Sequence, residues 1–243
     1  MQAALSTRPV QLEAYITEQA SDLQQAFALR YTVFSEAFNA NIDSDDGLDK
    51  DEFDEVCHHL VVKDISQNKV VAYSRILVHS SAQASEFYSA GEFELTPILT
   101  HGFRYMEIGR TCIDANYRSG AAIALLWGHI AQFMLSNNID ALMGCASIDL
   151  SAGTSKALSI MNYLRQKHFT QADQRAVPKQ GLPQVTTERC TPADLPPLLK
   201  AYLRMGCKAC GEAYWDKAFN TADVLLLLHK DEINMRYLKH FLR

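Results

Sequence analysis

The pattern of apolar and polar positions divides the first third of the chain into a helix and a hairpin. Aromatic residues recur at three- and four-residue steps between Glu18 and Phe38, which predicts one apolar helix face. The runs His58–Val62 and Val70–Val78 are rich in β-branched residues and are separated by polar positions. This arrangement is typical of two antiparallel strands joined by a short turn.

Strands and helices alternate in the rest of the chain. A strand is predicted at Tyr105–Asp114, followed by a polar turn and an alanine- and leucine-rich helix at Ala121–Leu135. Further strands are predicted at Asp140–Ile148, Cys207–Trp215 and Thr221–Leu228, and further helices at Thr154–Gln166, Leu198–Met205 and Asp231–Leu242. This order indicates an α/β (α+β) fold in which helices cover a mixed sheet.

The segment Gln171–Pro197 shows no regular pattern and contains five of the seven prolines. Its composition resembles that of a linker, but compact apolar runs resume after it. We therefore interpret residues 1–243 as one domain, with an irregular surface excursion around residues 171–197.

The composition excludes several classes of protein. With 243 residues, of which 48% are hydrophobic and 21% charged, the chain can bury its own core. A net charge of −5 argues against a nucleic-acid-binding protein. The first ten residues do not resemble a secretion signal, and the longest apolar run, Ala121–Trp127, is too short to span a bilayer. We expect a cytoplasmic protein that at most contacts the inner face of the membrane.

Two patterns that can indicate a metal site are incomplete. Cys207 and Cys210 form a single CxxC pair, and the other cysteines supply no matching second pair. The acidic loop from Asn41 to Glu55 is close to a calcium loop, but its glycine, Gly47, stands one position late. We therefore predict no metal. The loop is then either a solvated charged surface or a region that attracts a cationic amino substrate.

The turn between the strand Tyr105–Asp114 and the next helix is a candidate phosphate site. The N-terminus of a helix presents unpaired backbone N–H groups, which bind anions. Gly120 lets the backbone approach a ligand closely, and Arg118 adds a fixed positive charge. The alternative is an ordinary helix start in which Ser119 caps the N–H groups.

Charged residues interrupt two otherwise apolar strands. Glu107 and Arg110 are three positions apart, so we expect their side chains on opposite faces, with only one facing a cofactor. Buried charges need partners or a water-filled cleft, so these residues are either catalytic or part of structural ion pairs. His59 and Asp64 match the H-x4-D spacing of glycerolipid acyltransferases, but an offset of five also places them on opposite faces, which indicates a coincidental match.

Several separate blocks of the sequence occur in an order that is found in a known family. They are Glu107–Arg110, Tyr117–Gly120, Leu125–Trp127, Gly144–Ser147, Leu195–Arg204 and Asp216–Asp223. On these blocks the chain resembles the ornithine-lipid-type N-acyltransferases, often labelled hemolysin-like. These are relatives of the acyl-homoserine-lactone synthases within the GNAT superfamily. The resemblance extends from about Leu29 to Leu228, and the ordered blocks are more specific than any single motif.

The resemblance implies a GNAT-like sheet in which the strands Tyr105–Asp114 and Asp140–Ile148 splay apart. The acyl-phosphopantetheine arm of acyl carrier protein, the expected partner and acyl donor, would lie in this split, and no cofactor would be bound permanently. Its phosphate would lie at Arg118, Ser119, Gly120 and Ala121. The glycine of this turn comes earlier than in the usual GNAT loop, which leaves coenzyme A as an alternative donor.

The resemblance also implies the chemistry. A long-chain, 3-hydroxy fatty acyl group would pass from acyl carrier protein to the α-amine of ornithine and give a lyso-ornithine lipid, with lysine and glycine as alternative acceptors. Glu107 would take the proton from the amine, and Arg110 would bind the carboxylate of the amino acid or support Glu107. Asp51, Asp54 and Ser147 would bind the amino-acid substrate, the two aspartates through its positive charge.

Two other functions stay open. An acyl-homoserine-lactone-type signal synthase would need a site for S-adenosylmethionine, which the sequence neither shows nor excludes. A non-catalytic acyl-carrier or membrane-docking module would use the basic and apolar residues of Asp231–Leu242. Those residues suit a lipid surface and packing on the domain equally well.

Overall fold

The computed structural model describes residues 10–38, 44–183, 185, 187, 190–234 and 236. Its strands are β1 (Leu12–Thr17), β2 (His58–Asp64), β3 (Lys69–Ser80), β4 (Phe93–Glu94), β5 (Arg104–Ile113), β6 (Ala141–Asp149), β7 (Val177–Pro178), β8 (Lys208–Ala209), β9 (Tyr214–Asp216) and β10 (Thr221–His229). Its helices are α1 (Ala20–Phe38), α2 (Ala121–Ser136), α3 (Ser155–Lys167) and α4 (Pro197–Met205). Within this part of the chain, no helix combines the length and the apolar character that crossing a membrane requires.

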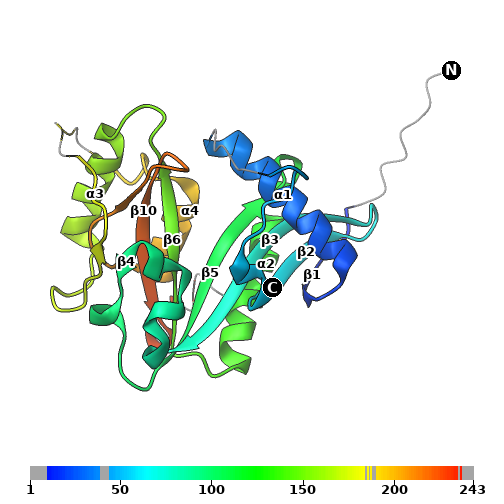
Figure 1. Ribbon diagram of the computed structural model, residues 1–243, viewed down its shortest axis with the longest axis horizontal. Coiled ribbons are helices and arrows are strands. Elements are labelled where there is room, and N and C mark those ends of the chain that lie inside the picture. Colours follow the sequence, from blue (N-terminus) through cyan, green and yellow to red (C-terminus); the bar gives the residue numbers. More distant parts are fainter. Residues whose placement is uncertain are drawn as a thin grey trace.

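A mixed sheet forms the framework of the molecule (Figure 1). Its strand order is β1-β2-β3-β5-β6-β10-β8, and β9 also pairs with β10. Strands β5 and β6 are parallel, whereas the other neighbouring strands described in this sheet are antiparallel. Helix α1 lies against β3 and β5, and α2 lies against β1, β2 and β3. The mixed sheet covered by helices that the sequence predicted is therefore confirmed.

The sheet separates into two halves between β5 and β6. These strands pair at three successive positions, from Tyr105 with Ala141 to Glu107 with Met143, and the pairing then stops although both strands are described along their whole length. Gly144 lies at the point where they separate, and a Cβ atom there would lie 2.5 Å from the backbone oxygen of Ile108. Figure 1 shows the ribbons of β5 and β6 diverging from this point. The backbone therefore defines the split: glycine at position 144 allows the close contact with Ile108, and the two strands diverge from there.

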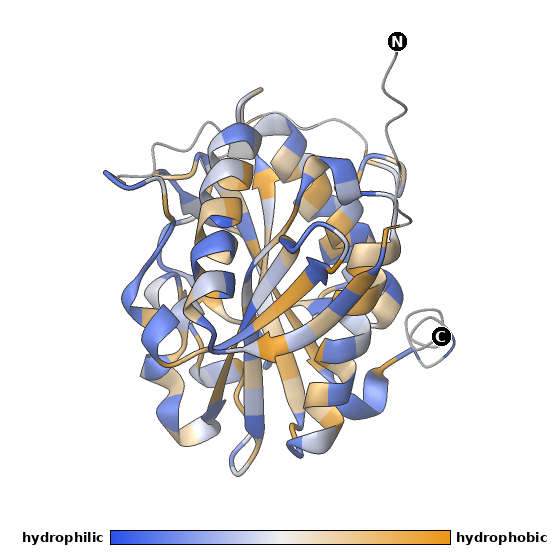
Figure 2. Ribbon diagram, turned by 90° about the vertical axis from the view of Figure 1, so that its right-hand side faces the viewer, coloured by the Kyte–Doolittle hydropathy of each residue, from blue (hydrophilic) through white to orange (hydrophobic). Residues whose placement is uncertain are grey.

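Strand β2 illustrates why some strands are apolar at consecutive positions. Leu60 and Val62 belong to the core cluster that contains Leu126 of α2, whereas Val61 packs on the other face of the sheet with Ala26 of α1. Both faces of the strand are covered, so its apolar run is continuous rather than alternating. Figure 2 shows apolar residues on the strands and polar residues on the outer sides of the helices. Full burial of each such aliphatic side chain contributes about 1.5–3 kcal/mol.

The structure corrects one predicted strand and adds three strands that were not predicted. The predicted strand Cys207–Trp215 is two short strands, β8 and β9, separated by a turn in which Gly211 has φ +132°. Most of the predicted helix Asp231–Leu242 lies outside the described residues, which lack 235 and 237–243, and at its start the structure has a single 3₁₀ turn, Lys230–Glu232. Strands β1, β4 and β7 were not predicted, because β4 and β7 have only two residues each and the buried positions of β1 recur every third residue instead of alternating.

The described part of the irregular segment 171–197 lies against the region of β8 and β9. The backbone N–H of Ala176 donates a hydrogen bond to the carbonyl oxygen of Cys210 (2.7 Å), and the N–H of Trp215 donates to the carbonyl oxygen of Gln180 (2.8 Å). The N–H of Lys179 reaches the carbonyl oxygen of Glu92 (2.8 Å). The segment thereby connects the turns before β5 with strands β8 and β9.

Candidate active site

A cavity of about 730 Å³ lies where β5 and β6 separate. Strand β5 contributes residues from Glu107 to Ile113, and β6 contributes Cys145 and Ser147. Further parts of the wall come from α1, β3, the 3₁₀ turn Tyr88–Gly91, the start of α2, the start of α4, the end of β9 and the start of β10. Residues that are far apart in the sequence therefore meet at the gap in the sheet.

Glu107 and Arg110 both line this cavity, contrary to the prediction that they lie on opposite faces. Between the pairs Tyr73–Cys112 and Arg75–Gly109, strand β3 advances two residues while β5 advances three. This is a β-bulge, and Arg110 within it has φ +53°. Because the extra residue shifts the alternation of side chains, the two charged groups reach the same space.

Glu107 is 3% exposed and holds the turn before β4 in place. Its Oε2 accepts a hydrogen bond from the backbone N–H of Tyr88 (2.7 Å), and its Oε1 accepts from the N–H of Ser89 (2.9 Å) and from the Ser89 hydroxyl. Burial raises the pKa of Glu107, while these hydrogen bonds oppose the rise. A carboxylate offers about four acceptor positions, so about one remains for a substrate.

Asp51 and Asp54 belong to a cluster of three arginines and three aspartates, which we call the Arg–Asp cluster. Its members are Arg30, Arg75, Arg110, Asp49, Asp51 and Asp54. Arg30 binds Asp49 (2.9 Å) and Asp54 (2.7 Å), and Arg110 binds Asp49 and Asp51 (both 3.1 Å). Neither Asp51 nor Asp54 lines the cavity. The prediction that these two aspartates bind a cationic substrate is therefore not supported by the geometry.

The predicted phosphate turn opens on the cavity. Arg118 and Gly120 line it, and Ser119 and Ala121 are exposed beside them. Gly120 is the N-cap residue of α2, with φ +107°, and no side chain caps the helix, so the alternative of a Ser119 cap is excluded. The first N–H groups of a 16-residue helix therefore remain available to an anion at the cavity mouth.

A second group of carboxylates lines the cavity, and we call it the acidic cluster. It consists of Glu92, Asp216 and Asp223, with one oxygen of each within 4.8 Å of the others. Burial and repulsion from Asp223 raise the pKa of Glu92 far above its ordinary value. Burial also raises the pKa of Asp223, against the hydrogen bond that it receives from Ser147. Ser147, a predicted substrate residue, thus lies beside the acidic cluster.

Sequence reasoning missed the acidic cluster. Asp223 carries a usable signal, because it is the one charged residue inside the apolar run Thr221–Leu228. Glu92 carries none, since the segment around it has neither a strand nor a helix period. The cluster forms only when the turn after Gly91 meets the ends of β9 and β10.

Two other candidates have structural partners. His59 bonds to the Tyr73 hydroxyl (2.8 Å) and to the carbonyl oxygen of Asp54 (2.9 Å), whereas Asp64 accepts from the Tyr117 hydroxyl (2.8 Å). His59 and Asp64 therefore do not act as a pair, as predicted. Burial and the nearby Glu92 raise the pKa of the Cys145 thiol, which disfavours the thiolate form that a nucleophilic cysteine needs. Residues 41–43 of the calcium-like loop lie outside the described residues.

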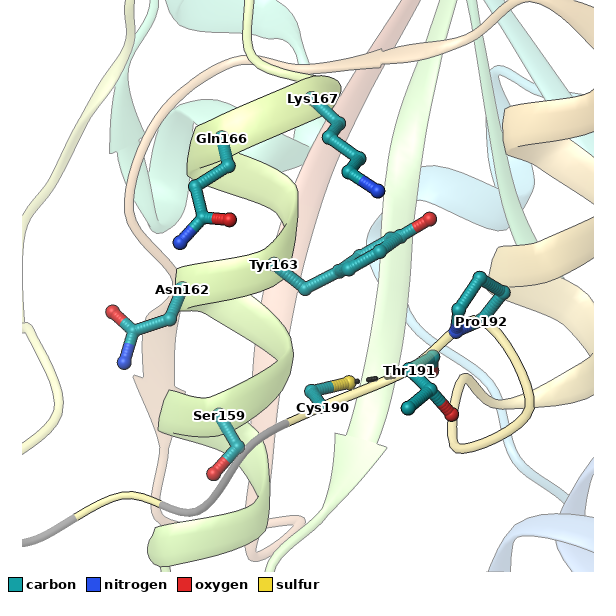
Figure 3. A pocket seen from close by; sticks show the side chains of 8 residues that line it. All are labelled: Ser159, Asn162, Tyr163, Gln166, Lys167, Cys190, Thr191 and Pro192. Atoms are coloured by element: carbon teal, nitrogen blue, oxygen red, sulfur yellow. Dashed lines mark hydrogen bonds between the residues drawn. The ribbon is translucent and has the colours of Figure 1, made fainter.

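A second cavity, of about 390 Å³, lies between α3 and the segment Cys190–Pro192. Figure 3 shows Tyr163 of α3 projecting toward Pro192, with Lys167 beside its ring at 5.1 Å from the ring centroid. Its lining contains no carboxylate and no histidine among the described residues. The cavity between β5 and β6 combines buried carboxylates with a helix N-terminus and is therefore the candidate active site.

Known proteins of similar sequence are acyltransferases, which agrees with a site for acyl transfer at this cavity. Residues 29–128 match the family model described as an acetyltransferase (GNAT) domain. The chain is 31% identical to L-ornithine N(alpha)-acyltransferase of Rhodobacter capsulatus, over 98% of each chain.

Two solved structures share the fold. One is FeeM, an N-acyl amino acid synthase from uncultured soil microbes, with a TM-score of 0.58 and 12% identity over 96% of this chain and 99% of that one. The other is the AHL synthase LasI, with a TM-score of 0.53 and 12% identity over 91% of each chain. The predicted GNAT-like fold is thereby confirmed.

Proposed function

Since this chain belongs to the family of L-ornithine N(alpha)-acyltransferases, we propose that it transfers a long-chain 3-hydroxy fatty acyl group from acyl carrier protein to the α-amine of ornithine, giving a lyso-ornithine lipid. One observation carries the proposal. A single cavity at the gap between β5 and β6 brings together a helix N-terminus, a buried carboxylate, an arginine and an apolar wall.

The donor thioester enters through the gap. After Glu107, no described strand pairs with the edge of β5 that faces β6, so the backbone groups of this edge are available to the amides of a pantetheine arm. The phosphate of that arm lies at the uncapped start of α2, beside Arg118. A phosphodiester needs few donors, so the early Gly120 suffices for a carrier protein, and coenzyme A is the alternative source of the same arm.

The fatty acyl chain lies along the apolar part of the wall. This part consists of residues from α1, β3, α2 and α4, among them Val33, Phe34, Leu77, Ile123, Leu198 and Ala201. Transfer of each methylene group of an acyl chain from water to such a surface contributes about 0.8 kcal/mol. A long chain therefore supplies most of the donor's affinity, and short thioesters should react poorly.

The acceptor amine attacks the thioester carbon beside Glu107. The α-ammonium must first lose a proton, and the remaining acceptor position of Glu107 takes it directly or through a water molecule. The C–N bond then forms, the C–S bond breaks, and the pantetheine thiolate leaves and takes up the second proton that the nitrogen loses as the amide forms. Arg110 lines the cavity and binds the substrate carboxylate. Its Nε and Nη2 are held by Asp49 and Asp51, which fixes the guanidinium in place.

Mass spectrometry tests the proposal. Purified protein is incubated with long-chain 3-hydroxyacyl carrier protein or the matching coenzyme A thioester, together with ornithine, lysine or glycine. We expect N-acylornithine, formed fastest from the carrier protein. If no amino acid is acylated although the acyl carrier protein binds, the chain is a docking module. If a lactone forms when S-adenosylmethionine is supplied, it is a signal synthase.

Glu107→Gln tests the proposed base. We expect turnover to fall by about 10²–10⁴-fold while carrier binding is kept. The glutamine amide oxygen can replace Oε1 toward Ser89, but its NH₂ group faces the Tyr88 N–H, so the melting temperature is measured as well. Ser89→Ala is the matched control, because it removes one hydrogen bond to Glu107 and keeps the carboxylate. Equal loss in both variants would assign Glu107 a structural role only.

A further inference from the structure

We propose that Glu92, Asp216 and Asp223 bind the side-chain ammonium group of the acceptor amino acid, so that this acidic cluster selects a dibasic acceptor over a neutral one. The inference rests on the function proposed above and adds a specificity site to the same cavity. Three different elements supply the carboxylates: the turn before β4, the end of β9, and β10.

Within the part of the chain that the structure describes, no cationic side chain is paired with the acidic cluster. No lysine or arginine among the described residues forms an ion pair with any of its three members. Arg110 attracts Asp223 at longer range, but it is bonded to Asp49 and Asp51. Three carboxylates so close together repel one another, and a bound cation relieves that repulsion.

Glu92 points to a ligand independently of the cluster. The residue is 92% buried, since its exposure is 8%, yet the described residues offer its carboxylate a single weak donor, the Cys145 thiol at 3.5 Å from Oε2. Its Oε1 accepts no hydrogen bond from them. The other two members are better satisfied: Asp216 accepts from two backbone N–H groups, and Asp223 accepts from Thr221 and Ser147. A buried carboxylate that lines a cavity without a strong donor is expected to receive one from a ligand.

The shape of the site fits an ammonium group. An ammonium ion offers three N–H donors and no acceptor, and three carboxylates from different directions can each take one. The turn after Asp216 lies between Arg110, which binds the carboxylate of the acceptor, and the acidic cluster, which binds its side chain. The Phe219 N–H donates to Asp216 (3.0 Å), and the Phe219 ring lies 5.8 Å from the Arg110 guanidinium. An amino acid held at its carboxylate by Arg110 can thus extend its cationic side chain toward the acidic cluster.

The test compares two acceptors of the same carbon skeleton. Norvaline is ornithine without the δ-amine, so both contain the reacting α-amine and the carboxylate. For the unaltered protein we expect kcat/KM for ornithine to exceed that for norvaline by about 100-fold, and Glu92→Gln to reduce this ratio by about tenfold, which corresponds to 1.4 kcal/mol. Asp223→Asn is the second variant. Glu94→Gln is the matched control, because it makes the same charge change on a nearby exposed residue outside this cavity.

Several outcomes would overturn the inference while leaving the proposed function intact. One is that Glu92→Gln and Asp223→Asn slow ornithine and norvaline equally. Another is that EDTA removes activity with ornithine and Mg²⁺ or Ca²⁺ restores it in the unaltered protein but not in the variants, because the acidic cluster would then be a metal site. Failure to acylate either acceptor in the unaltered protein would instead contradict the proposed function. Melting temperatures identify a variant that does not fold.

Discussion

Two groups of carboxylates lie near the cavity, and they differ in how their charge is balanced. In the Arg–Asp cluster, three aspartates face three arginines at distances up to 3.2 Å. In the acidic cluster, three carboxylates lie within 4.8 Å of one another with no ion-pair partner among the described residues. In the first arrangement each charge has a partner, so that removing one partner would leave a buried charge unpaired, and the second arrangement is costly unless a ligand neutralises it. Acidic residues that form a conspicuous run in the sequence can thus be structural. Acidic residues that are isolated in the sequence form the site proposed for the ammonium group of the acceptor.

Arg30→Met should give the largest effect, because it breaks the balanced cluster. Arg30 is fully buried, and its removal leaves Asp49 and Asp54 without their closest partner. We expect unfolding to become easier by about 3–5 kcal/mol, measured by urea denaturation. The double variant Arg30→Met, Asp54→Asn removes one orphaned charge and should recover part of that loss. A cost below about 1 kcal/mol for Arg30→Met would show that the cluster is not a structural unit.

Glu92→Gln should shift stability in the opposite direction. This substitution removes a repulsive charge from the acidic cluster, so the ligand-free protein should become more stable by about 1–3 kcal/mol at pH 8. A gain in stability together with a loss of ornithine specificity is the signature of a site kept strained for binding. Thermal denaturation without substrate measures it, with Glu94→Gln as control. A loss of stability would mean that Glu92 is already satisfied in the folded protein.

The two clusters should also respond to pH with opposite signs. Burial raises the pKa of Glu92 above its ordinary value of 4.5, so its contribution to stability is present below pH 4.5 and is lost as the pH rises through the raised value. For Asp54, burial raises the pKa, but the hydrogen bond and charge of Arg30, the backbone hydrogen bond from Asp51 and the charge of Arg75 together lower it below 3.8. Its contribution is present above pH 3.8 and is lost as the pH falls through the lowered value.

Melting temperatures of Glu92→Gln and the unaltered protein between about pH 5 and pH 8 test this difference. We expect the advantage of the variant to grow with pH, while both proteins lose stability in the same way below about pH 4. An advantage that is constant over the whole range would show that Glu92 does not titrate between these values.

Much of the fold could be read from the sequence, because its signals are local. The apolar runs that became β2, β3, β5 and β6 and the turn that opens α2 lie where the pattern placed them. The bulge at Arg110 could not be predicted, since a positive φ at an arginine leaves no trace in an alternation of apolar and polar residues. The sequence pattern therefore located Glu107 and Arg110 on the correct strand but on opposite faces.

The candidate site was less predictable, because its partners are distant in the sequence. Asp54 is 24 residues from Arg30, and Asp51 is 59 residues from Arg110. A run of acidic residues in the sequence does not reveal whether arginines will form ion pairs with them. The role predicted for Asp51 and Asp54 rested on the family resemblance and on their charge, and in the fold both aspartates form ion pairs with arginines. Glu92 and Asp223 come together only in the tertiary structure, so the sequence could not show that their carboxylates lie side by side.

Asp46→Asn should give the smallest effect and shows whether acidity by itself matters. Asp46 belongs to the same acidic loop as Asp51, but it is exposed and pairs with the exposed Lys50 at 2.9 Å. Hydrogen bonds from Lys50 and Ser44 lower the pKa of Asp46, yet solvent screens such a pair. An asparagine still accepts the Leu48 N–H, so we expect the melting temperature to stay within about 1 °C and the ornithine-to-norvaline ratio to be unchanged. A reduced ratio would mean that the loop attracts the cationic acceptor through its total charge, and the contrast between the two clusters would then lose its meaning for specificity.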